Sequence, residues 1–205
     1  MSADPRAQPL SESDVDADPI RQFGAWLEEA RAAGEPLPEA MTLATADASG
    51  RPSARMLLLK SAGREGFTFF TGYGSRKGRE LEENPRAAIV LYWHALGRQV
   101  RVEGTVRRLP PEESDAYFET RPPRSRAAAA ASHQSEAIES REQVERELER
   151  LLAEHGDQVP RPPHWGGYVL EPESIELWQH REDRLHDRLR YRREAAGWVV
   201  ERLAP

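Results

Sequence analysis

The chain contains no cysteine among its 205 residues. This absence excludes disulfide bonds, a thiolate nucleophile and any metal site built on sulfur. It fits an intracellular setting, and we expect a cytoplasmic protein. Six histidines are present, but none falls in a His-Glu-x-x-His pattern. We therefore expect no metal site.

Long hydrophobic runs are also absent. No apolar run approaches the roughly 18 residues that span a bilayer, and the acidic, proline-containing start of the chain does not resemble a signal peptide. Positive charge is outnumbered, because 29 Lys and Arg residues face 35 Asp and Glu residues, for a formal net charge of −6. We expect a soluble protein whose partner is neither a membrane nor a nucleic acid.

What is present is enough apolar sequence for one domain with its own core, since 38% of the residues are hydrophobic. Residues 1–17 are polar and acidic, and we expect them to form a flexible arm. The predicted domain covers residues 18–205. It opens with a helix that Asp18 caps, that has Pro19 at its first position and that ends at Gly34.

Most of the remaining elements are predicted strands, so the fold class is mainly β. Few helices interrupt the strands, which favours an antiparallel, Greek-key-like sheet or barrel with flanking helices over βαβ units. The strands are expected at Met41–Ala46, Pro52–Lys60, Phe67–Thr71, Ala87–His94, Gln99–Leu109, Tyr168–Leu170, Ser174–Gln179, Leu185–Arg193 and Gly197–Arg202. Helices are expected at Glu112–Thr120, at Arg126–Ser132 and from Ser140, where Gln143 completes a capping-box signature.

An anion site is predicted around the strand from Arg55 to Lys60. This strand reads as buried and apolar, yet it has a cation at each end, and a buried cation must be paired or face an anion. A glycine-bearing loop leads to Ser75, a helix cap that is followed by Arg76 and Lys77. Backbone N–H groups and side-chain charge at such a helix start attract phosphate, although a single Ser-Arg-Lys is more often an ordinary cap. We predict that these four cations hold a phosphate-bearing ligand.

The segment Arg184-Leu185-His186-Asp187-Arg188 is a second candidate site. In a strand, Arg184, His186 and Arg188 share one face. Three chargeable groups in a row repel one another unless an anion lies before them. The alternative is an exposed face that is paired with acids.

A third group joins Tyr117, Arg121 and Ser125, which recur at a spacing of four residues. Pro122-Pro123 favours a turn over a continuous helix, but an aromatic ring, a cation and a hydroxyl gather locally in either case. Trp178, taken alone, is more often a core residue than a ligand contact.

Together these segments resemble the pyridoxamine 5′-phosphate oxidase family over residues 18–205, nearly the whole chain. So many motifs in the family's order make the resemblance specific. The motifs are Arg55-Met56-Leu57-Leu58-Leu59-Lys60, Ser75-Arg76-Lys77, Arg98-Gln99-Val100, Tyr117 with Arg121-Pro122 and Ser125, Gln134-Ser135, Trp165-Gly166-Gly167, Trp178-Gln179, Arg184-Leu185-His186-Asp187-Arg188 and Arg202-Leu203-Ala204-Pro205.

The resemblance implies a fold, a cofactor and a set of contacts. The implied fold is the FMN-binding split β-barrel, working as a homodimer with two flavin sites at the subunit interface. FMN contacts are implied at Arg55, Met56, Leu57, Leu58, Leu59, Lys60, Phe70, Thr71, Arg76, Lys77, Gln99, Gln134, Ser135, Trp178 and Arg188. Substrate contacts are implied at Lys60, Tyr117, Arg121, Ser125, Arg184 and His186, with Arg184 and His186 as the catalytic pair.

The implied reaction belongs to vitamin B6 metabolism. It is the FMN-dependent oxidation of pyridoxamine 5′-phosphate and pyridoxine 5′-phosphate to pyridoxal 5′-phosphate, with O₂ reduced to hydrogen peroxide. Two alternatives stay open: a related flavin oxidase of another heterocycle, such as a dihydrophenazine intermediate, and a non-catalytic protein that binds flavin or pyridoxal phosphate. Lys60, Arg121 and Ser125 argue against the first, because an unphosphorylated substrate leaves them without an anion.

The chain departs from the family's pattern at several positions. Ala128 and Ala130 stand where the family commonly has glycine and tryptophan, and His180 stands where glycine is usual. Phe70 stands where tyrosine is frequent, which removes a hydroxyl and keeps the ring. No charged substrate contact is lost, so we expect a pocket of altered shape with its anion ligands intact.

Overall fold

The computed structural model describes residues 8–205. The strands are β1 (Ala40–Ala46), β2 (Pro52–Leu58), β3 (Ser61–Gly63), β4 (Gly66–Gly72), β5 (Arg86–Trp93), β6 (Arg98–Arg108), β7 (Trp165–Gln179), β8 (Asp187–Glu194) and β9 (Gly197–Arg202). The helices are α1 (Pro19–Ala32), α2 (Arg76–Glu83), α3 (Pro111–Glu119), α4 (Pro123–Ala131) and α5 (Arg141–His155). Short 3₁₀ helices lie at Glu12–Asp14, His94–Leu96 and Gly156–Gln158.

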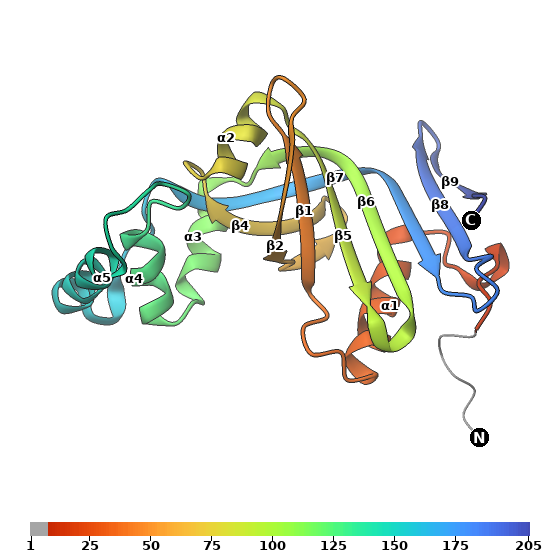
Figure 1. The fold of residues 1–205 in the computed structure, drawn as a ribbon, viewed down its shortest axis with the longest axis horizontal. Helices are drawn as coiled ribbons and strands as arrows, with labels where there is room; N and C mark the ends of the chain where they lie inside the picture. Colours follow the sequence, from red (N-terminus) through yellow and green to blue (C-terminus); the bar gives the residue numbers. More distant parts are fainter. Residues whose placement is uncertain (1–7) are drawn as a thin grey trace.

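The strands form one antiparallel sheet in the order β2-β1-β5-β6-β7-β4-β3, and β8 and β9 extend it from β7. Helices α4 and α5 lie at one end of the molecule and the β8–β9 hairpin lies at the other (Figure 1). The predicted mainly β, antiparallel architecture with flanking helices is confirmed. Within residues 8–205, no helix combines the length and the apolar character needed to cross a membrane.

Strand β7 pairs with three other strands of the sheet. It is 15 residues long, and β6 pairs with most of one side of it. On its other side, β4 pairs with its first part and β8 with its last part. Residues at the two ends of β7 therefore belong to two different neighbourhoods of the fold.

The prediction of two short strands, Tyr168–Leu170 and Ser174–Gln179, is wrong because β7 runs through both. Pro172 lies between them and has no N–H to donate to a ladder. A register shift between Glu103 and Gly104 of β6 lets the pairing resume beyond the proline.

Two further expectations about strands fail. β8 begins at Asp187, so the predicted alternation of Arg184, His186 and Arg188 along a strand is wrong; Arg184 lies in a loop, with φ of 67°. β2 is an edge strand with alternate residues exposed, so it is not buried in the single chain. Leu58 on it is exposed.

The helix starts are mostly as predicted. Asp18 caps α1 by accepting a hydrogen bond from the N–H of Ile20, and Ser75 caps α2 by accepting one from the N–H of Gly78. Ser140 is the N-cap residue of α5, but its side chain makes no capping hydrogen bond, so the predicted capping box is wrong.

The first residues of the predicted arm, 1–7, lie outside the described residues. From Gln8 onward the segment lies against the end of the sheet, because Leu10 is buried in the core and Glu12 pairs with Arg202 of β9. The structure therefore differs from the expectation of a flexible arm over residues 8–17.

The core lies between α1 and the sheet. Phe23 of α1 is fully buried, with its ring centroid 5.0 Å from that of Phe67 in β4 and 6.0 Å from that of Trp93 in β5. The indole N–H of Trp93 donates to the carbonyl of Pro38 at 2.8 Å, so this buried polar group is satisfied. The helix thus holds the middle of the sheet in place.

Phe23→Ala is expected to lower the free energy of unfolding by about 3–5 kcal/mol, because it removes a buried ring and leaves a cavity. Urea unfolding followed by tryptophan fluorescence measures the loss. Leu37→Ala is the control, because Leu37 is 62% exposed, and it should change stability by less than about 0.5 kcal/mol. Equal losses in the two variants would contradict the central place of Phe23 in the core.

Candidate functional site

A cavity of about 390 Å³ lies where β2, β4, α3, α4 and the start of β7 meet. Seven of its lining residues were predicted site residues: Leu57, Lys60, Phe70, Thr71, Tyr117, Arg121 and Gln134. The other five lining residues were not among the predicted ligand contacts: Gly72, Ala128, Ala129, Ser132 and Trp165. A larger cavity of about 740 Å³, between the end of α4 and α5, shares Ser132 and Gln134 but has none of the aromatic wall.

One wall of the smaller cavity is a stack of aromatic rings. The centroid of the Phe70 ring lies 3.8 Å from that of the Tyr117 ring and 5.5 Å from that of the Trp165 ring. The interplanar angle is 16° for both pairs. The stack requires Gly167, because a Cβ there would lie 2.8 Å from a ring carbon of Phe70. This wall can accept a flat ring by further stacking.

Arg121 supplies the cavity with a cation, one nitrogen of which has no hydrogen-bond partner within residues 8–205. Its guanidinium lies 4.7 Å over the ring of Trp165, and its Nη1 is buried without a hydrogen-bond partner among the described residues. Burial lowers the pKa of Arg121 below its ordinary value. A buried guanidinium nitrogen without an acceptor favours the binding of an anion.

Lys77 is a second cation next to the cavity, and it is almost fully buried. Its ammonium group donates to Thr71 Oγ1 at 3.0 Å, Ser75 Oγ at 3.1 Å and Gln134 Oε1 at 2.8 Å. All three partners are neutral. Burial, helped by the nearby charge of Arg55, lowers the pKa of Lys77 to about 8.

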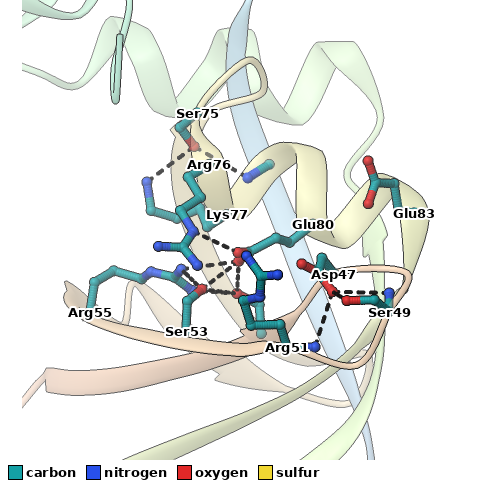
Figure 2. A network of polar contacts seen from close by, with 12 residues as sticks. Asp47, Ser49, Arg51, Ser53, Arg55, Ser75, Arg76, Lys77, Glu80 and Glu83 are labelled. Carbon is teal, nitrogen blue, oxygen red and sulfur yellow. Dashed lines mark hydrogen bonds and ion pairs between the residues drawn. The ribbon is translucent and has the colours of Figure 1, made fainter. Parts of the chain in front are cut away.

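Glu80 neutralises part of the positive charge around Lys77. Figure 2 shows its carboxylate between Arg55 and Arg76, with Arg55 Nη2 at 3.2 Å and Arg76 Nε at 2.8 Å. Ser53 and Thr45 also donate to it. Burial alone would raise the pKa of Glu80, but these hydrogen bonds outweigh it and hold the pKa at about 2.

Three of the four cations predicted to hold an anion lie together around Glu80, whereas the fourth, Lys60, lines the cavity. Arg55 and Arg76 both form an ion pair with the carboxylate of Glu80, so neither charge is unpaired. Three cations face one carboxylate, however, and this leaves an excess of positive charge at the start of α2. The excess is centred on Lys77, whose direct partners carry no charge.

A second group of predicted residues lies at the far end of β7. The centroid of the Trp178 ring lies 4.6 Å from that of the His186 ring and 6.1 Å from that of the His180 ring. Gln99 pairs with Trp178 in the sheet, and Arg188 is bound to Glu176 at 2.9 Å. None of these residues lines the cavity, and neither does Arg184.

The remaining predicted residues are dispersed. Ser125 lies in α4 but does not line the cavity of about 390 Å³, whereas Ser135 lines the larger cavity. Met56 and Leu58 are exposed on β2 and Leu59 is buried in the core. The alternation along the strand separates these neighbours.

The antiparallel sheet belongs to the split-barrel class predicted from the sequence. The fold matches a pyridoxamine 5′-phosphate oxidase-related, FMN-binding protein from Nostoc punctiforme with a TM-score of 0.75 at 18% identity, over 92% of this chain and 98% of that one.

This chain belongs to the pyridoxamine 5′-phosphate oxidase family. Residues 27–155 match the family described as pyridoxamine 5′-phosphate oxidase, and residues 165–205 match its C-terminal dimerisation region.

Individual relatives agree with this assignment. The chain is 59% identical to a pyridoxine/pyridoxamine 5′-phosphate oxidase of Rubrobacter xylanophilus, over 96% of this chain and 91% of the relative. It is 56% identical to one of Bordetella avium, over 96% and 93%. It also superimposes on PhzG from Burkholderia lata, solved with tetrahydrophenazine-1-carboxylic acid, with a TM-score of 0.92 and 38% identity, over 98% of this chain and all of that one.

Glu80→Gln is expected to lower the free energy of unfolding at pH 7 by about 2–4 kcal/mol, because the folded pKa of about 2 lies well below the ordinary value of 4.5. This contribution is complete above pH 4.5 and disappears as the pH falls towards 2. The difference between parent and variant should therefore shrink between those values in urea unfolding. Glu83→Gln, an exposed position on the same helix, is the control; a difference that grows in acid would refute the linkage.

Proposed function

We propose that this chain oxidises pyridoxamine 5′-phosphate and pyridoxine 5′-phosphate to pyridoxal 5′-phosphate, with FMN as its cofactor and O₂ reduced to hydrogen peroxide. The observation that carries the proposal is a pair of cation sites at an aromatic-walled cavity: Lys77, which donates to Gln134 in the cavity wall, and Arg121, which lines the cavity itself. Two phosphate-bearing ring ligands, the cofactor and the substrate, call for two such sites. The similarity to curated oxidases of these substrates supports the same function.

The residues around α2 suit the FMN phosphate. Lys77 offers a buried cation whose neutral partners can be exchanged for phosphate oxygens, and Arg55 and Arg76 add charge beyond that of Glu80. Backbone N–H groups at the start of α2 can also donate hydrogen bonds to a phosphate. When bound, FMN supplies the hydride acceptor of the reaction, and the chain's own residues bind and orient the two rings.

Arg121 and Lys60 suit the substrate phosphate. Both line the cavity, and the Lys60 ammonium lies 6.0 Å from the centroid of the Tyr117 ring. Arg121 has an unsatisfied nitrogen ready to donate. A phosphate held here would place the attached pyridine ring beside the stacked wall, where water is excluded and the ring is oriented.

A second copy of the chain is needed to complete this site. Trp165 and Trp178 lie 13 positions apart on β7, so at roughly 3.3 Å per residue about 40 Å of extended strand separates the cavity from His186 and its neighbours. That span exceeds one substrate molecule. We propose a homodimer in which the partner's copy of the Trp178 group faces this cavity, in keeping with the match of residues 165–205 to a dimerisation region.

A second candidate function is the oxidation of a reduced phenazine carboxylic acid. The similarity to PhzG, solved with such a compound, favours it. The small side chains of Ala128 and Ala129 in the cavity wall also leave space for a wider ring system. A carboxylate could serve as the anion for Arg121 in place of a phosphate.

The visible spectrum of the purified protein, followed by anaerobic addition of substrate, tests the proposal. We expect a flavin spectrum that pyridoxamine 5′-phosphate bleaches, because reduction removes the visible absorbance of the flavin. Bleaching by a dihydrophenazine carboxylic acid alone would favour the second candidate. A flavin spectrum that neither compound bleaches would refute both oxidase functions and leave a non-catalytic binding protein.

Arg121→Ala is expected to lower kcat/KM for pyridoxine 5′-phosphate by about ten- to a hundredfold, mainly through KM, because one charge-assisted contact with phosphate is lost. FMN affinity should stay unchanged. Any activity on unphosphorylated pyridoxine should also stay unchanged, since that molecule lacks the phosphate. Arg124→Ala, which removes an exposed arginine of α4 that pairs with Glu149, is the matched control. Loss of FMN in Arg121→Ala would show that Arg121 is a flavin ligand.

A further inference from the structure

The loop of residues 180–186 joins β7 to β8 and carries Arg184 and His186. The N–H of Arg181 donates to His186 Nδ1 at 3.0 Å, the N–H of Arg184 donates to the carbonyl of Arg181 at 3.2 Å, and the N–H of Leu185 donates to Asp183 Oδ1 at 3.0 Å. The first bond assigns the proton of a neutral His186 ring to Nε2 and fixes the direction in which the ring points.

The ring of His186 packs against those of Trp178 and His180, with centroids 4.6 and 5.3 Å away, but residues 182–185 of the loop are exposed. Leu185 is 66% exposed, and Arg184 adopts a left-handed backbone conformation that is unfavourable for a residue with a side chain. His180 anchors the beginning of the loop by donating its N–H to the carbonyl of Gly97 at 2.8 Å. The end of the loop is held by these ring contacts of His186 and by a polar anchor at the next residue.

Asp187, the first residue of β8, supplies that anchor. Its Oδ1 accepts from Arg202 Nη1 at 2.8 Å, and its Oδ2 accepts from the N–H of Leu10 at 3.1 Å. Arg181 Nε, from within the loop, lies 3.8 Å from the same Oδ2. One carboxylate thus joins the loop to β9 and to the N-terminal segment.

The N-terminal segment in turn reinforces the anchor. Arg202 also donates to the carbonyl of Leu10 at 2.9 Å and to Glu12 at 2.9 and 3.0 Å. The Leu10 side chain is buried in the core. In Figure 1 the red N-terminal segment accordingly lies beside the blue β8–β9 hairpin.

We propose that Asp187 is a positioning residue, which holds residues 180–186 so that Arg184 and His186 are presented in one fixed arrangement. It acts through Arg202 and Leu10 and touches neither substrate nor flavin. This inference rests on the proposed function, in which Arg184 and His186 lie against the substrate. A loop that is already ordered loses less conformational freedom when the substrate binds.

Hydrogen exchange followed by mass spectrometry on the full chain reports the state of the loop directly. Asp187→Asn removes the charge that holds Arg202 and Arg181 and keeps the size of the side chain. We expect amides of residues 180–186 to exchange about tenfold faster in this variant. Glu201→Gln is the matched control, because Glu201 accepts from Arg190 and Arg192 on the same hairpin and should leave exchange in the loop unchanged.

Steady-state kinetics with pyridoxine 5′-phosphate tests the consequence. Asp187→Asn should lower kcat/KM by about ten- to a hundredfold at full FMN occupancy. Asp187→Glu, which restores the carboxylate, should recover part of the loss, and Glu201→Gln should behave like the parent. Arg202→Gln provides a second test if Asp187→Asn does not fold, because it loosens the anchor while the carboxylate remains.

The outcomes separate the two proposals. Unchanged loop exchange in Asp187→Asn and Arg202→Gln overturns the positioning role. Faster exchange with unchanged kcat/KM also overturns it, and so does an equal loss of kcat/KM in Glu201→Gln, which would reduce Asp187 to a stabiliser of the hairpin. A parent protein that fails to oxidise pyridoxine 5′-phosphate refutes the proposed function, and the exchange measurements then still decide whether Asp187 holds the loop.

Discussion

The length of β7 is the constraint on which the rest of the structure depends. Because the strand is continuous past Pro172, Trp165 at its start and Trp178 near its end cannot take part in one site within one chain. The first end meets β4 and the helical region, and the second meets β8. Among the described residues, Lys60 and Arg121 line the cavity together with aromatic rings, whereas His186 lies beside Trp178 at the other end of the strand. Under the proposed function, a strand of this length requires a partner subunit to bring the two groups together.

The positive charge around the start of α2 is a second constraint on the structure. Arg55, Arg76 and Lys77 repel one another, and Glu80 reduces that repulsion without cancelling it. The four hydroxyl and guanidinium groups that donate to its carboxylate keep it ionised in spite of burial. Lys77 keeps only neutral partners, so its hydrogen bonds can be replaced by stronger ones to an anion. The cluster therefore keeps an excess of positive charge that suits an anion.

Sequence reasoning succeeded where the cause was local. The cap at Ser75, the cations that follow it and the positions of most strands along the β-rich block depend on neighbouring residues, and they were predicted. The pairing of Arg55 with Glu80 was not, because the two residues lie 25 positions apart and meet only through the packing of α2 on β1 and β2. The conformation of Arg184 was missed because no glycine marks it. Motif resemblance predicted ligand contacts at residues near both ends of β7, and the fold separates these residues into two groups.

The two candidate substrates differ in their anionic group and in their ring system. The anionic group distinguishes them better at this site than the ring system does. The aromatic wall of Phe70, Tyr117 and Trp165 accepts any flat ring, and the alanines of α4 set only a loose limit on its width. A phosphate offers three oxygens that can accept from Arg121 and Lys60 at once, whereas a carboxylate offers two in one plane. Arg121 projects from the turn between α3 and α4 and Lys60 from the end of β2. Cations that approach from two elements suit the tetrahedral anion better, and this geometry favours the phosphorylated substrate.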